Sequence, residues 1–152
     1  MELDRERTLS REIALFAVAQ GLALNNKPLI AWPAREFDPA IVPGDASDSD
    51  GPTENIYLRV SAFPVPPDTR GISSGWGIYQ WTQQVSVYIR EGIGLTNALI
   101  QAEALRQTFP YGRKIAGDEH TFLVTADPAI TTDISMDSWV SIPVSIRLQT
   151  IT

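Results

Sequence analysis

The sequence predicts an α+β protein in which a mostly antiparallel sheet of about four to five strands carries two helices on one face. Two segments, Trp76 to Arg90 and Trp139 to Thr150, alternate apolar and polar residues with period two, as strands with one buried face do. Two others, Asp4 to Leu24 and Thr96 to Phe109, place apolar residues at spacings of three and four, as half-buried helices do. The length of 152 residues supports a single domain over residues 1–152, large enough to bury a core.

Composition removes several kinds of chemistry. The chain has no cysteine, which leaves no disulfide and no thiolate ligand or nucleophile. Its formal net charge of −6 disfavours tight binding of nucleic-acid phosphates, although an acidic surface can line a passage that DNA crosses without sticking. No apolar run reaches transmembrane length, and the charged residues 1–11 do not lead into a signal-peptide core. We therefore expect a soluble intracellular protein.

The first half of the chain is predicted to hold one helix and two strands. The helix Asp4 to Leu24 has a mixed rather than basic polar face, so it is expected to pack on a sheet and not on a membrane. A short apolar strand, Leu29 to Trp32, lies between two prolines. The second strand runs from Asn55 to Phe63 and is expected to end there, because prolines at 64, 66 and 67 cannot continue a ladder.

An acidic loop, Pro43 to Pro52, lies between those two strands. Asp48, Asp50 and Gly51 match three positions of a calcium-binding EF-hand loop. Its first and twelfth positions would be Ala46 and Tyr57, which supply no carboxylate. A specific calcium site is therefore not expected.

The strand Trp76 to Arg90 is unusually long. Only Gln83 interrupts its apolar side, and fifteen extended residues would span roughly 50 Å. A compact chain of this size has a radius of gyration of about 15 Å, so the strand must either bend at a bulge or project toward a neighbour. A strand of this length therefore favours a protein that assembles with other subunits over one with a catalytic site.

The second half continues with a glycine turn, Glu91 to Gly94, and the helix Thr96 to Phe109, capped by Thr96 or Asn97. A basic connector, Pro110 to Glu119, precedes a strand at Thr121 to Ala126. A polar loop, Asp127 to Ser138, leads to the last strand, Trp139 to Thr150. Because Pro143 lacks a donor, we expect this strand at a sheet edge or with a bulge.

Two motifs resemble catalytic or nucleotide-binding signatures. Residues 71–75 match G-x-S-x-G, but they follow a proline-rich loop and precede a strand, whereas a nucleophile elbow joins a strand to a helix. The one histidine, His120, is expected to be an ordinary surface residue. Gly92-Ile93-Gly94 lies between a strand and a helix, yet the strand is amphipathic and the third glycine position is Asn97, which favours a plain tight turn.

We expect no enzyme activity, catalytic residue, cofactor or metal site, because no carboxylate pair or ligand cluster stands out. Arginines and aromatic residues are instead enriched at protein interfaces. Trp76 and Trp139, which lie at strand starts on the polar side, are interface candidates, although they could equally be structural caps. The full set of candidate interface residues is Arg59, Arg70, Trp76, Tyr88, Arg90, Trp139 and Arg147.

In its ordered features the chain resembles the phage tail terminator family, which includes the lambda minor tail protein U. The resemblance covers nearly the full chain. It begins at the N-terminal helix and includes, in order, these segments: Leu29-Ile30-Ala31-Trp32-Pro33, Tyr57-Leu58-Arg59-Val60, Gln83 to Ile89, Gly92-Ile93-Gly94 and Trp139-Val140-Ser141-Ile142-Pro143-Val144. The acidic loop Asp45 to Asp50 and the proline-rich loop Pro64 to Asp68 depart from it, so no family interface residue is carried over.

The resemblance implies a structural virion protein that forms a ring, expected to be a hexamer. Such a ring would cap the tail tube, stop its polymerisation and present a surface to the head–tail connector, with DNA passing through the lumen without specific binding and no membrane contact. It implies a place at the head-proximal end of the virion tail after assembly in the host cytoplasm. Two alternatives remain: another head–tail connector or neck protein, and a small nucleotide-binding protein that uses Gly92 to Asn97.

Overall fold

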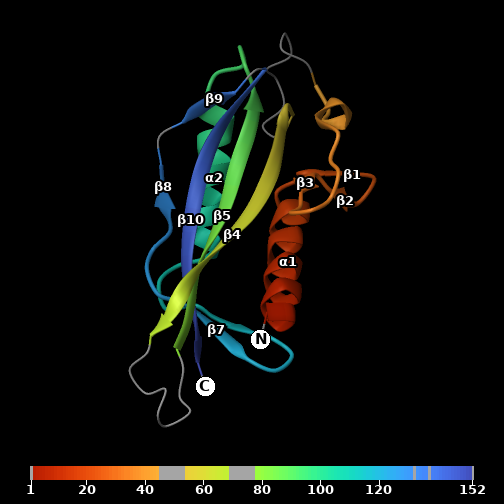
Figure 1. The fold of residues 1–152 in the computed structure, drawn as a ribbon. Helices are drawn as coiled ribbons and strands as arrows, with labels where there is room; N and C mark the ends of the chain where they lie inside the picture. Colours follow the sequence, from red (N-terminus) through yellow and green to blue (C-terminus); the bar gives the residue numbers. More distant parts are fainter. Residues whose placement is uncertain (1, 45–53, 69–77, 132, 137, 152) are drawn as a thin grey trace.

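The computed structural model describes residues 2–44, 54–68, 78–131, 133–136 and 138–151 (Figure 1). Within these ranges the chain forms two α-helices, one short 3-10 helix and ten strands. The helical elements are α1 (Glu2–Ala19), η1 (Pro39–Ile41) and α2 (Thr96–Thr108). The strands are β1 (Ala23–Leu24), β2 (Lys27–Pro28), β3 (Ile30–Ala31), β4 (Ile56–Asp68), β5 (Ile78–Arg90), β6 (Lys114–Ala116), β7 (Thr121–Val124), β8 (Ala129–Ile130), β9 (Ile134–Met136) and β10 (Trp139–Ile151).

The predicted α+β class is confirmed, but the sheet is larger and more mixed than expected. In the described residues, eight strands form one sheet in the order β3-β4-β5-β10-β7-β6, with β8 and β9 also pairing with β10. The β3–β4 pair is parallel, and the other pairs are antiparallel. The extra strands are two or three residues long and lie in segments predicted as connectors. Such short strands are too brief to show period-two alternation.

Three strands of 13 residues each, β4, β5 and β10, form the centre of the sheet. Their register places Val60, Val85 and Val144 in one row. At about 3.3 Å per residue each strand spans roughly 43 Å. Figure 1 shows them running twisted along the length of the molecule. The predicted long strand is present from Ile78; its first two predicted residues, 76 and 77, lie outside the described ranges.

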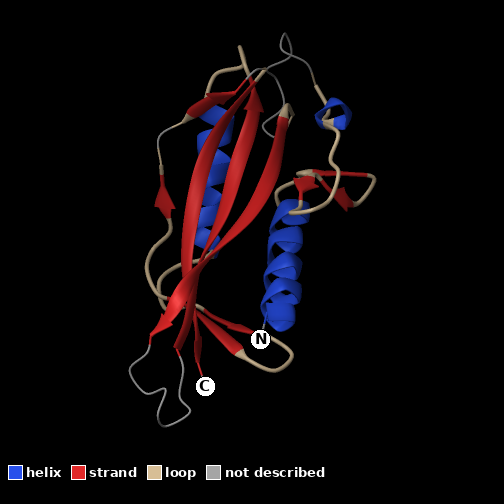
Figure 2. Ribbon diagram, in the orientation of Figure 1, coloured by secondary structure: helices blue, strands red, loops and turns tan. Residues whose placement is uncertain are grey.

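Both helices cover the same face of this sheet (Figure 2). Leu9, Ile13 and Phe16 of α1 and Leu105 of α2 are buried in one cluster with the inward residues of the three long strands. Those inward residues are Ile56, Leu58, Val60, Trp81, Val85, Val87, Ile89, Ile142, Val144, Ile146 and Leu148. The alternation read from the sequence therefore assigned the core face correctly.

The strand β4 does not end at Phe63 as predicted, but continues through three prolines to Asp68. The Leu58 N–H donates to Leu29 O on the β3 side, so even-numbered residues of β4 direct their backbone groups toward that side. Pro64 is paired with Trp81 in the same unbroken register, so its missing donor falls on the side where no described strand lies. An edge position accommodates proline because no ladder hydrogen bond is lost.

The prediction that β10 lies at an edge or carries a bulge is wrong. It pairs with β5 along eleven consecutive positions on one side and with β7, β8 and β9 on the other. Pro143 lies opposite Thr131, just beyond the end of β8, and its carbonyl accepts from Thr131 N at 3.0 Å. The missing N–H costs only the one bond that it would have returned to the Thr131 carbonyl, and the pairing with β5 continues unbroken past this position.

Local turn chemistry shortens the first helix. The helix α1 ends at Ala19 rather than Leu24. Asn25 and Asn26 join β1 to β2, with φ angles of 52° and 65°. Positive φ at two central residues is what a tight hairpin turn requires. At the second helix, Leu95 occupies the cap position and makes no side-chain cap hydrogen bond, in place of the predicted Thr96 or Asn97.

Candidate assembly surface

The face of the sheet opposite the helices collects the outward residues of the three long strands. Antiparallel register arranges them in rows, among them Tyr57–Tyr88–Ser141, Arg59–Ser86–Pro143 and Phe63–Thr82–Arg147. Five of the seven candidate interface residues lie on this face: Arg59, Tyr88, Arg90, Trp139 and Arg147. The other two, Arg70 and Trp76, lie outside the described residues.

Half of this face is covered by residues 29–42, called here the covering segment. Leu29, Ala31 and Val42 of this segment are buried against Tyr57 and Tyr88 in a second apolar cluster, with Phe37 and Trp139 packed at its border. The rings are in direct contact: Tyr57 stacks on Tyr88 at 4.9 Å between centroids and meets Trp139 edge-on at 4.9 Å. Phe37 of the covering segment joins this cluster, with its ring centroid 4.8 Å from that of Tyr57, and so ties the segment to the sheet.

Two arginines flank the aromatic cluster. The Arg59 guanidinium lies 5.5 Å from the ring centroid of Tyr88, and that of Arg90 lies 4.6 Å from the ring of Trp139. Arg90 also donates to the Val42 carbonyl at 3.1 Å, so it holds the end of the covering segment. Burial raises the pKa of the Tyr57 hydroxyl, and the hydrogen bond and charge of Arg59 offset only part of this effect.

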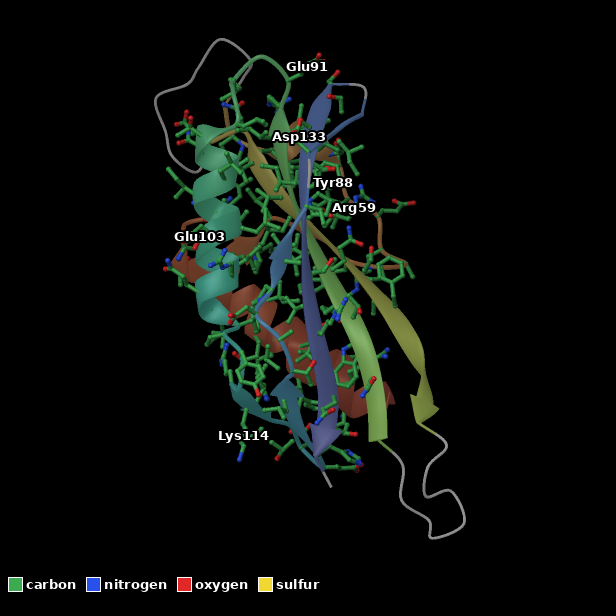
Figure 3. All side chains as sticks on the ribbon, turned by 90° about the vertical axis from the view of Figure 1, so that its left-hand side faces the viewer. Arg59, Tyr88, Glu91, Glu103, Lys114 and Asp133 are labelled. Carbon is green, nitrogen blue, oxygen red and sulfur yellow. The ribbon has the colours of Figure 1, made fainter. Side chains whose placement is uncertain are left out.

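Four of the predicted residues thus come together around one aromatic cluster, but not all of them are accessible. Tyr88 is 8% exposed and makes its contacts within its own chain. Trp139 and Arg90 are half-buried, whereas Arg59 is exposed (Figure 3). The structure therefore leaves Arg59 available for a partner and gives Tyr88 and Trp139 roles inside the subunit as well.

The remaining half of the face carries no covering segment in the described chain. There Phe63 is 52% exposed and shares a row with Thr82 and the exposed Arg147. Arg147 borders a shallow hollow of about 350 Å³ that Thr82 and Gln149 also line. Phe63 was not among the interface residues predicted from the sequence. An apolar residue on the polar side of a strand was the signal that could have identified it. We name this area the open face, defined by Phe63, Thr82 and Arg147.

A second polar site, also missed from the sequence, fixes the start of α1. The buried Asp4 carboxylate accepts hydrogen bonds from the backbone N–H groups of Asp118, Glu119 and His120 at 2.7, 3.1 and 2.8 Å. The His120 ring nitrogen Nδ1 lies 3.1 Å from the same carboxylate. Burial alone would raise the pKa of Asp4, but these donors lower it to about 2. His120 is thus half-buried and partnered, and the expectation of an ordinary surface histidine is wrong.

Two kinds of site can be checked against the described residues. The described residues hold no group of three or more His, Asp or Glu side chains that could bind a metal ion. The turn at Gly92 to Asn97 follows β5, whose two neighbours are both antiparallel to it. Dinucleotide-binding turns belong to parallel βαβ units, so the turn lacks that context. Among the described helices, none has the length and apolarity needed to cross a membrane.

The fold is that of an α+β protein with one uncovered area on its sheet, and comparison with known proteins identifies its family. The family model described as phage tail terminator protein matches residues 12–148. The chain therefore belongs to the phage tail terminator family, a family of structural phage tail proteins. One solved structure, which has no functional description, has the same fold: the TM-score is 0.75 at 18% sequence identity, over 100% of this chain and 96% of the other. A search of curated proteins found no match.

Proposed function

We propose that this protein forms a ring that caps the growing end of the phage tail tube, stops its polymerisation and offers a surface for head–tail joining. Family membership over residues 12–148 carries the proposal. Within that range lie β4, β5, most of β10 and the open face described above. A rigid sheet with an uncovered face of mixed apolar and cationic character fits a contact between proteins better than a small-molecule site.

The charge of the chain supports the same role. A ring that lets DNA pass should not hold it, and a net charge of −6 disfavours contact with phosphates. The partners would be further copies of the chain, expected to number six, together with the tail tube protein and the head–tail connector. The role is structural and needs no cofactor.

Electron microscopy of negatively stained tail tubes tests this function. Purified protein added to polymerising tube subunits should sit at tube ends and shorten the length distribution. Density confined to the connector, with tube growth unchanged, would instead identify another head–tail joining protein, which is the main alternative. A rise in melting temperature on adding nucleotide, abolished by Gly94→Ala, would favour the nucleotide-binding alternative.

A further inference from the structure

We infer that the open face of one subunit packs against the outer surface of α2 of the next copy in the ring. This inference rests on the proposed ring and adds which surfaces join. The open face presents an aromatic ring and a cation, Phe63 and Arg147, on one row of the sheet. Both side chains are exposed in the single chain. Exposed apolar groups beside a charge are typical of surfaces that bind proteins.

The outer surface of α2 carries properties complementary to those of the open face, namely exposed apolar side chains and a negative charge. Leu99 and Ile100 are 47% and 50% exposed although they belong to a helix that packs on the sheet. Glu103 follows at the helical spacing that places it on the same side, and its side chain is 46% exposed. Its contact with Arg106 is long, at 3.9 Å, and exposed, so it holds the carboxylate only weakly.

The two surfaces lie on opposite sides of the subunit. Figure 3 shows Glu103 on the outward side of α2 and Arg59 on the other side of the sheet. One subunit therefore cannot bring its own two surfaces into contact with each other. A contact between two different surfaces of identical copies is heterologous, and such contacts close into a ring when the rotation between neighbours permits it.

Charge selects α2 over α1 as the partner surface. The exposed side of α1 also carries apolar residues, Leu15 at 59% and Val18 at 47%. On the same side of α1 lies Arg11, which is exposed and would face Arg147 with like charge. Like charges across an interface are unfavourable, whereas Glu103 offers the opposite sign.

A charge exchange followed by native mass measurement tests the contact. Arg147→Glu and Glu103→Arg should each lower the apparent association constant about tenfold or more, because each places like charges together. The double variant should recover most of the assembly. Leu15→Ser, on the exposed side of α1, is the matched control and should leave the oligomer intact. Full assembly by both single variants, or no recovery by the double variant, would overturn the inference.

Disulfide trapping gives a second, independent measurement because the chain contains no cysteine. Arg147→Cys combined with Glu103→Cys should give a ladder of covalent oligomers under oxidation, with or without tail tubes. Arg147→Cys combined with Leu15→Cys should give none. A bond inside one subunit is excluded by the position of the two residues on opposite sides of the sheet. No ladder in either condition would contradict the contact.

The two proposals can fail separately. If the ladder forms but the wild-type protein never occupies tube ends, the contact stands and the capping function falls. If the wild-type protein caps tubes while the ladder is absent and both charge variants cap as well, the function stands and this contact falls.

Discussion

At the scale of single residues, the Asp4 carboxylate is a densely hydrogen-bonded side chain that the sequence pattern did not reveal. It lies near the start of α1 and accepts from three successive backbone N–H groups of residues 118–120. An isolated aspartate early in a helix usually indicates only a favourable helix-dipole position. The backbone groups that bond it are more than a hundred residues away in sequence, so the sequence around Asp4 does not indicate them.

Replacing Asp4 should reveal its role through pH. The lowered pKa, about 2 against an ordinary value of 3.8, means that the folded state favours the ionised carboxylate. The stabilisation is therefore complete above about pH 4 and is lost as the pH falls toward 2. Asp4→Asn should lower the melting temperature at pH 7, and its deficit should shrink between pH 4 and 2.

Thermal unfolding followed by circular dichroism at several pH values measures this effect. Asp118→Asn is the control, since Asp118 contributes its backbone N–H and not its side chain to the contact. A deficit for Asp4→Asn that stays constant down to pH 2 would show that the carboxylate charge is not the cause.

At the scale of elements, the covering segment depends on a few contacts with the long strands. Arg90 makes two of these contacts: it donates a hydrogen bond to the Val42 carbonyl, and its guanidinium lies over the Trp139 ring. Arg90→Ala should therefore loosen the segment without unfolding the sheet. Hydrogen exchange of a peptide covering residues 34–44 should increase about tenfold, as expected for a lost bond from a charged donor.

Arg59→Ala is the matched control for that experiment. Arg59 also lies over a ring of the cluster but is exposed. Its removal should change the exchange of residues 34–44 much less than removal of Arg90. Equal increases for both variants would mean that the stacking of cations on rings, rather than the bond to Val42, holds the segment.

The long elements were predictable and the short ones were not, for physical reasons. β5, β10 and α2 each hold enough residues for a period to show, and their core faces were assigned correctly. Prolines at 64 and 143 led to wrong expectations for β4 and β10. Whether a missing donor costs a hydrogen bond depends on which side of the strand is paired, and this information is tertiary. The grouping of Arg59, Tyr88, Arg90 and Trp139 likewise depended on register, whereas their residue types alone had marked them as candidates.

At the scale of the whole molecule, one large core joins both helices to the long strands, and a smaller one lies behind the sheet. If residues 1–152 form one cooperative domain, both should be lost together. Unfolding in guanidinium should then show a single transition by circular dichroism and by tryptophan fluorescence, since Trp32 and Trp81 lie in or against the first cluster and Trp139 lies against the second.

Two leucines of α2 provide the matched variants. Leu105→Ala removes a fully buried side chain and should lower the free energy of unfolding by about 2–5 kcal/mol in both signals. Leu99→Ala, on the exposed side, should change it by about 0.5 kcal/mol or less. A shift in only one signal would divide the chain into two units. The samples must be dilute enough for the subunit to be monomeric.

The proline at position 64 has a consequence for behaviour at high concentration. An unpaired strand at the edge of a sheet is the usual starting point of fibrous aggregates, because each free N–H there can form a hydrogen bond with another chain. With its donor missing on that edge, β4 offers an incomplete template, and stray peptides gain little by adding to it. At high protein concentration, copies would therefore associate less readily through backbone pairing at this edge.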